Sequence, residues 1–144
     1  MAIALSQSAT KEYSHDLKKG KVVVACINSP NIVTISGDVA AIEEIEAIFK
    51  EKDIWARKLK LNTAYHSHHM SMIAVEYLSY IIDVSPKTSE VAFTTIFSSV
   101  TKEEMAPSQL GASYWVQNML QPVEFSGAVA TLLAPKDAKS KRQK

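Results

Sequence analysis

The chain has 144 residues, of which 47% are hydrophobic and 22% charged, a composition typical of one soluble globular domain with a sizeable core. The formal net charge of +1 excludes a general electrostatic argument for nucleic-acid binding. Its single cysteine, Cys26, excludes an internal disulfide, and no apolar run approaches the length of a membrane span. We therefore expect a soluble protein of the cytoplasm.

The first sixty residues alternate between patterns typical of strands and patterns typical of helices. The clearest helix begins after Asp38, a residue type that often caps helices, and continues as an apolar stripe. The predicted elements are strands over 3–6, 22–27, 32–36 and 57–62 (Leu59 and Leu61 inward), a surface helix over 9–18, and a helix with Val39, Ile42, Ile45 and Phe49 inward. Their order, strand-helix-strand-strand-helix-strand, is that of the ferredoxin-like unit.

From Met70 onward the pattern is mainly helical. The predicted elements are a helix over 70–81, a strand over 93–98, a loop over 101–111, helices over 112–119 and 125–133, and a polar, basic end over 135–144. One strand cannot form a sheet by itself, so this half predicts part of a larger α/β layer whose other strands lie elsewhere. We expect an exposed apolar surface around 93–98 for the same reason.

Three of the four histidines lie between Thr63 and Met70, where the strand pattern gives way to the helical one. His66 directly follows a predicted strand, a position where α/β proteins place functional side chains, and histidine is the commonest general base. From the residues alone, a partly exposed loop histidine with Ser67 as a helix cap is the favoured interpretation. A zinc site using His66 and His69 is less favoured, because no Glu-x-x-His pair or second cysteine accompanies it.

Nucleophilic catalysis needs an activated side chain on a constrained turn such as G-x-S-x-G. None of the four glycines lies four residues from another, so that turn is absent from these 144 residues, as are a P-loop and a dinucleotide fingerprint. Cys26 lies in an apolar strand pattern and is expected in the core. The first three predicted strands carry no aromatic residue to stack on bases, which argues against an RNA-binding sheet.

Five stretches, taken together, resemble the acyltransferase domain of iterative type I polyketide synthases, especially fungal reducing ones, and of malonyl-CoA:ACP transacylases. They cover residues 23–30, 33–38, 64–70, 97–101, and 114–118 together with 122–126. The resemblance extends over residues 1 to about 134. It implies an α/β (α+β) fold, with a ferredoxin-like βαββαβ subdomain over 1–62, the C-terminal part of an α/β-hydrolase-like acyltransferase subdomain over 63–134, and a basic tail over 135–144.

The resemblance also implies a reaction. In the family, a serine in a Gly-His-Ser-x-Gly turn attacks the thioester of malonyl-CoA while a histidine takes its proton. The malonyl group then passes to the phosphopantetheine thiol of an acyl carrier protein. By motif position the histidine is His66, whereas the serine has no counterpart in these residues, so we expect the chain alone to be inactive. His68 and His69 are then expected to be helix-start residues.

Further residues follow from the same resemblance. Thr63, Ala64 and Tyr65 correspond to substrate-binding residues. The aromatic residue directly before the histidine resembles family members that select malonyl units. Thr63 matches neither the malonyl-selecting nor the methylmalonyl-selecting members. Gln121 corresponds to the residue whose backbone carbonyl orients the histidine. No metal or bound cofactor is implied. The implied partners are the carrier protein and the remainder of a polyketide synthase, with no nucleic acid and no membrane. The alternative is a non-catalytic ferredoxin-like module that binds a carrier protein or a partner subunit.

Overall fold

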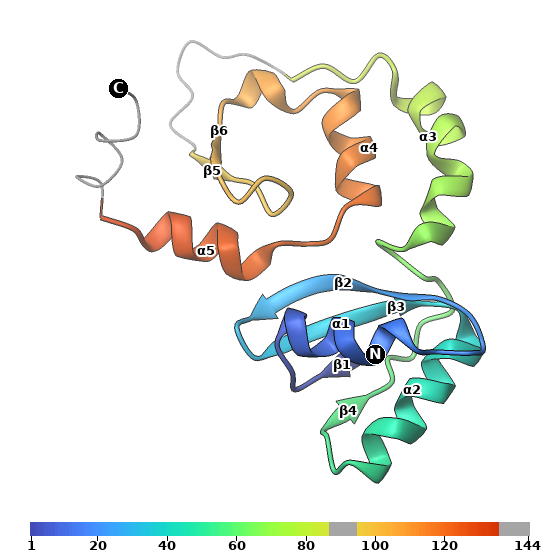
Figure 1. The fold of residues 1–144 in the computed structure, drawn as a ribbon. Helices are drawn as coiled ribbons and strands as arrows, with labels where there is room; N and C mark the ends of the chain where they lie inside the picture. Colours follow the sequence, from blue (N-terminus) through green and yellow to red (C-terminus); the bar gives the residue numbers. More distant parts are fainter. Residues whose placement is uncertain (87–94, 136–144) are drawn as a thin grey trace.

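The computed structural model describes residues 1–86 and 95–135 (Figure 1). Its elements in chain order are β1 (Ala2–Ile3), α1 (Gln7–His15), β2 (Val22–Ser29), β3 (Ile32–Gly37), α2 (Val39–Glu51), β4 (Ala56–Arg57), the 3₁₀ helix η1 (His68–Ile73), α3 (Ala74–Ile81), β5 (Ile96–Phe97), β6 (Glu104–Met105), the 3₁₀ helix η2 (Pro107–Gln109), α4 (Ala112–Leu120) and α5 (Phe125–Leu133). The first two residues of the predicted strand over 93–98 and all but Pro135 of the predicted basic end lie outside the described residues.

The first six elements have the predicted order and form a sheet with two helices. The strands lie in the order β2-β3-β1-β4, and every neighbouring pair is antiparallel. The apolar core combines side chains of the sheet with those of α2, and Tyr13 of α1 packs against it. The most deeply buried large side chains are Ile3, Val33, Ile35, Ile45 and Phe49, each at most 1% exposed. Burying one side chain of this size contributes about 1.5–3 kcal/mol, so this core holds the first half together.

Several details of the first half differ from the prediction. The first strand ends at Ile3 rather than at residue 6, and the surface helix covers Gln7–His15 rather than 9–18. Val39 is 67% exposed and Ala41 takes its place in the core. At about 100° per residue, the centre of the buried face of α2 lies about 105° away from Val39, outside the stripe. The last strand is also shorter than predicted: the chain leaves the sheet after Arg57, so Leu59 and Leu61, predicted to point inward, are 40% and 61% exposed.

The second half contains α3, α4, α5 and a small antiparallel pair. The predicted helix over 70–81 is a 3₁₀ turn followed by α3. The expectation of a single strand with no partner was wrong, because β6 forms inside the predicted loop over 101–111 and pairs with β5. Ile96 and Phe97 are consequently half-buried rather than exposed. Among the described residues of this half, the exposed apolar side chains include several on η1, α3, α5 and the residue after α3: Met72, Val75, Tyr80, Ile82, Phe125, Leu132 and Leu133.

The two halves are joined through the free edge of β2. The Val123 amide donates to the Ala25 carbonyl oxygen, and the Ile27 amide donates to the Val123 carbonyl oxygen, both at 2.8 Å. Cys26, which pairs with Val123 in parallel, is half-buried rather than in the core, and this burial raises the pKa of its thiol. The segment before α5 is therefore fixed relative to the sheet (Figure 1).

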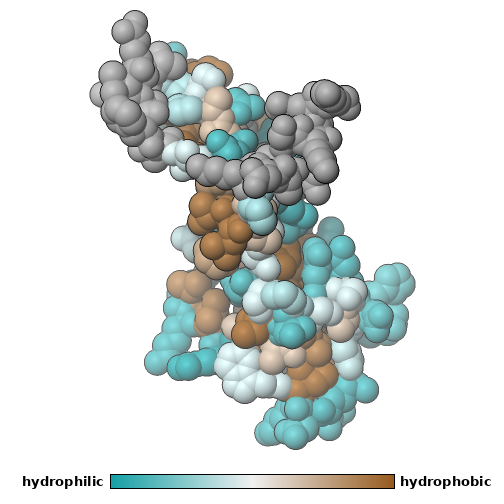
Figure 2. Space-filling model, turned by 90° about the vertical axis from the view of Figure 1, so that its left-hand side faces the viewer, coloured by the Kyte–Doolittle hydropathy of each residue, from teal (hydrophilic) through white to brown (hydrophobic). Residues whose placement is uncertain are grey.

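The surface of the molecule is mixed in character. Figure 2 shows apolar patches reaching the surface between polar ones on the face that it displays. Within residues 1–86 and 95–135, none of the helices has the length and apolar character needed to cross a membrane.

Candidate active site

His66 lies in a turn between β4 and η1 and has an unusual backbone. Its φ of 55° is in the left-handed region, which costs a non-glycine residue about 1–2 kcal/mol and is enriched at functional sites. The buried side chain of Ser67 holds the turn. Its Oγ donates to the Ala64 carbonyl oxygen at 2.7 Å and accepts from the His69 amide at 3.2 Å. Ser67 thus caps η1, as the sequence predicts, and closes the turn on the other side of His66.

The His66 ring contacts a backbone carbonyl from the far end of α4. Its Nδ1 lies 3.1 Å from the Gln121 carbonyl oxygen, although 55 residues separate the two in the chain. A carbonyl oxygen can only accept, so Nδ1 carries the hydrogen. In the neutral ring, Nε2 therefore keeps its lone pair, which is the arrangement that a general base requires.

Thr63, Ala64 and Tyr65 lie directly before His66 in the chain. Thr63 is exposed, Ala64 is half-buried, and Tyr65 is 54% exposed. The Ala64 carbonyl oxygen is the one that Ser67 bonds. Tyr65 is therefore accessible to solvent, and its part in substrate binding stays a prediction.

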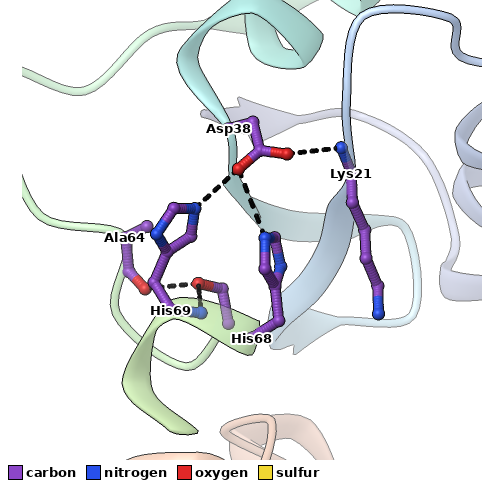
Figure 3. A network of polar contacts seen from close by, with 6 residues as sticks. Lys21, Asp38, Ala64, His68 and His69 are labelled. Carbon is purple, nitrogen blue, oxygen red and sulfur yellow. Dashed lines mark hydrogen bonds and ion pairs between the residues drawn. The ribbon is translucent and has the colours of Figure 1, made fainter. Parts of the chain in front are cut away.

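His68 and His69 begin η1 as predicted, but they also contact the first half of the chain (Figure 3). Their Nε2 atoms lie 3.2 and 2.7 Å from the same carboxylate oxygen, Oδ1 of Asp38. Asp38 Oδ2 accepts from the Lys21 amide at 2.7 Å. Asp38 occupies the position before α2 that the sequence predicts, yet its side chain makes no capping bond because it is turned toward these three groups.

Two glycines allow Asp38 and Lys21 to approach so closely. Gly20 and Gly37 have φ values of 137° and 156°, which side chains rarely adopt. A Cβ on Gly37 would lie 2.2 Å from the Lys21 carbonyl oxygen, and one on Gly20 would lie 2.6 Å from Asp38 Oδ2. Both glycines are therefore required by the geometry around the carboxylate.

Asp38, His68 and His69 are also the residues that could hold a metal ion among those the structure describes. Each offers one ligand atom, and the three atoms lie within 4.8 Å of one another. His66, which the sequence paired with His69 as possible ligands, is not part of this group. Both Nε2 atoms hydrogen-bond Asp38 Oδ1 in this arrangement. Sequence spacing missed it because Asp38 is about thirty residues away.

The contacts around Asp38 predict a pH dependence of stability. The Lys21 amide, followed by the His69 side chain, lowers the pKa of Asp38 from 3.8 to about 2. The stabilisation is then complete above pH 3.8 and is lost as the pH falls toward 2, because the unfolded chain binds the proton first. Urea unfolding of the wild type and Asp38→Asn should give free energies whose difference shrinks between pH 5 and pH 2. A difference that stays constant over this range would contradict the assignment.

Comparison with known families places these observations in context. The family model for the acyl transferase domain matches residues 1–139. The partially reducing polyketide synthase tpeA of Talaromyces stipitatus is 45% identical over 139 residues, 96% of this chain, and the highly reducing polyketide synthase alnA of Emericella nidulans is 47% identical over 134 residues, 92% of this chain. The chain spans only 6% and 5% of the length of these two relatives.

Solved structures of similar fold agree with this comparison. The acyltransferase domain from module 8 of the salinomycin polyketide synthase superposes with a TM-score of 0.83 at 30% identity, over 92% of this chain and 30% of that one. A malonyl CoA-acyl carrier protein transacylase from Clostridium perfringens shares the fold, with a TM-score of 0.78 at 20% identity, over 92% of this chain and 41% of that one. The mixed α/β arrangement is therefore that of a part of an acyltransferase domain.

Proposed function

Because the chain belongs to the acyl transferase domain family and corresponds to the acyltransferase domain of a polyketide synthase, we propose that it supplies the catalytic histidine for malonyl transfer. The donor is malonyl-CoA and the acceptor is the phosphopantetheine thiol of an acyl carrier protein. The observation that supports this proposal most directly is the contact of His66 Nδ1 with the Gln121 carbonyl oxygen, which leaves Nε2 as the base.

The subdomains of this proposal follow the sheet topology. We assign residues 1–62 to a ferredoxin-like small subdomain, supported by the antiparallel strand order β2-β3-β1-β4 with two helices on the sheet. Residues 63–134 are the C-terminal part of a larger, α/β-hydrolase-like subdomain. His66 and Gln121 then both belong to the larger subdomain, with His66 close to its boundary with the small one.

In the first half of the reaction, His66 Nε2 takes the proton of a serine hydroxyl as the serine oxygen bonds to the thioester carbon. The carbon–sulfur bond breaks, and the imidazolium returns the proton to the coenzyme A thiolate. In the second half, Nε2 takes the proton of the phosphopantetheine thiol and the sulfur bonds to the ester carbon. The carbon–oxygen bond to serine then breaks, and the imidazolium returns the proton to the serine oxygen. The serine belongs to the part of the domain that these 144 residues do not include.

The Gln121 carbonyl has a positioning part in both halves. It accepts the Nδ1 hydrogen, which fixes the tautomer and the ring plane without placing a full negative charge beside the ring. The hydrogen bonds of Val123 to β2 hold this carbonyl in place. Ring and carbonyl are thus both fixed before substrate arrives, which is how preorganisation lowers a barrier.

We propose that the acyl group is malonyl rather than methylmalonyl, with Thr63, Ala64 and Tyr65 lining its site. The aromatic ring of Tyr65 supports this choice, since it lies next to His66 in the chain and is 54% exposed. The reaction needs no metal or resident cofactor, because phosphopantetheine arrives on the carrier protein. The remainder of a polyketide synthase is the expected partner, and the single cysteine is in keeping with a cytoplasmic protein.

A competition experiment tests this substrate assignment. The chain is completed with the N-terminal half of the tpeA acyltransferase domain and given equal concentrations of malonyl-CoA and methylmalonyl-CoA, with holo carrier protein as acceptor. Rejection of one extra methyl group corresponds to about a 10- to 200-fold preference, so mass spectrometry should find mainly malonyl-carrier protein. Tyr65→Ser should reduce this preference. An excess of the methylmalonyl product with the unaltered chain would refute the assignment.

A further inference from the structure

Resting on the proposed function, we propose that Asp38 is a positioning residue for the His66 base. Its carboxylate holds His68 and His69, and through them the turn that presents His66. Asp38 and the two imidazoles come from two segments about thirty positions apart, and the carboxylate is the group that bridges them (Figure 3).

The carboxylate is itself fixed to the sheet. Besides accepting from the Lys21 amide at 2.7 Å, Asp38 donates its own amide to the Lys21 carbonyl oxygen at 3.0 Å. Gly20 and Gly37 make the space for this double contact, as their missing Cβ atoms show. Because Lys21 precedes β2 and Asp38 follows β3, the carboxylate is anchored to the ends of two paired strands.

The two imidazoles depend on this carboxylate. Oδ1 can only accept, so both Nε2 atoms carry hydrogen. The other ring nitrogen of His68, Nδ1, is buried and has no hydrogen-bond partner among the residues that the structure describes. Asp38 is therefore the polar group that fixes the His68 ring, and the two rings lie 4.4 Å apart.

The contact is transmitted to His66 over a very short distance in the chain. Ser67 separates His66 from His68, and its Oγ bonds both the His69 amide and the Ala64 carbonyl oxygen. The turn from Ala64 to His69 consequently moves as one piece. The His66 ring also hydrogen-bonds the Gln121 carbonyl oxygen, and nearby Val123 is hydrogen-bonded to the edge of β2. His66 is thus connected to the same sheet both through Asp38 and through Gln121.

This arrangement favours a positioning role over a purely stabilising one. The side chains of Asp38, His68 and His69 are 34%, 32% and 35% exposed, and partly exposed ion pairs add little to stability. By contrast, a displacement of about 1 Å in a catalytic group can lower a rate about 100-fold. Loss of the two histidine contacts should therefore affect the rate of transfer more than the stability of the fold, to which the Lys21 contact of the same carboxylate contributes.

The chain by itself allows a first test that needs no activity. Nitrogen-15 spectra of the histidine rings should show His66 with hydrogen on Nδ1 and His68 and His69 with hydrogen on Nε2. In Asp38→Ala the His66 ring should exchange between both tautomers. The matched control is Glu43→Ala, on α2, whose carboxylate pairs with Lys58 at the surface and should leave His66 unchanged. An unchanged His66 tautomer in Asp38→Ala would overturn the proposal.

The completed domain allows a second test. Asp38→Ala should lower kcat for malonyl transfer about 10- to 100-fold, with KM for malonyl-CoA unchanged. His69→Gln, which keeps an N–H donor, should retain more of kcat than His69→Ala, and this pair remains informative should Asp38→Ala not fold. Equal kcat in the two His69 variants, or a change in KM alone, would contradict positioning. Failure of the unaltered domain to transfer malonyl would count against the proposed function, while the histidine spectra still test Asp38.

Discussion

Replacing His66 with alanine in the completed domain is expected to lower the rate of malonyl transfer by at least about 1,000-fold. The reason is chemical: without Nε2, no group in the described turn can take the serine proton. The Gln121 carbonyl oxygen, 3.1 Å from His66 Nδ1, leaves Nε2 of this ring as its basic nitrogen. His68 and His69 are held by their Nε2 atoms on Asp38, and the remaining ring nitrogen of His68 is buried, so we do not expect either ring to replace His66.

The measurement is transfer of malonyl from malonyl-CoA to holo carrier protein in single-turnover conditions. KM for malonyl-CoA should change little, because the variant keeps the backbone of the turn. The control is His15→Ala, the one histidine outside the segment, whose side chain is 88% exposed on α1. A rate close to that of the unaltered domain in His66→Ala would show that a different group is the base.

Periodicity predicted most of the regular elements, because the burial that generates the pattern is local to each element. The helix over Val39–Glu51 is an example, since its inward residues follow the helical repeat and pack on the sheet. Val39 was wrongly placed in this stripe: at about 100° per residue it lies about 105° from the centre of the buried face, and it is exposed.

The alternation of apolar and polar residues also overestimated the length of the last strand of the first half. Leu59 and Leu61 have the spacing of a half-buried strand, but the chain leaves the sheet after Arg57 and both remain exposed. Conversely, β6 has two residues and no alternation that a sequence could reveal. Its pairing with β5 is stabilised by a turn in which buried Ser98 accepts from the amides of Val100 and Thr101.

The candidate site depended on long-range contacts that spacing does not encode. His66 was only one loop histidine until the resemblance singled it out, and Gln121 contributes a backbone atom that has no side-chain signature. The contacts of Asp38 with His68 and His69 were missed entirely. An aspartate before a helix is readily interpreted as a helix cap. Only the fold shows that the Asp38 oxygens make no capping bond and instead contact Lys21, His68 and His69.

Incubated alone with malonyl-CoA, the 144-residue chain is expected to form no stable acyl adduct. The Gly-x-Ser-x-Gly turn is absent from its sequence, and removal of such a nucleophile costs about 10⁶-fold in a serine protease. Ser67, the serine next to His66, is 4% exposed and its Oγ is already bonded twice. Intact-mass spectrometry after incubation is the measurement. A malonyl adduct on any serine of this chain would contradict the proposal that the chain supplies only the histidine and that the nucleophilic serine lies outside it.

Adding a polypeptide that carries the N-terminal half of an acyltransferase domain should restore acylation, on the serine of that polypeptide. The physical reason lies in the surface of the second half. Its exposed apolar side chains include Met72, Val75, Tyr80, Leu132 and Leu133, which are 77%, 83%, 79%, 54% and 76% exposed. Burying them against a second polypeptide gains free energy at about 25 cal/mol per Å² of apolar surface. A Leu133→Asp change should therefore weaken association, whereas Lys60→Asp, in the exposed segment after β4, should not. If acylation did not require the added half and was unaffected by Leu133→Asp, then the serine and histidine would not be brought together across this apolar surface.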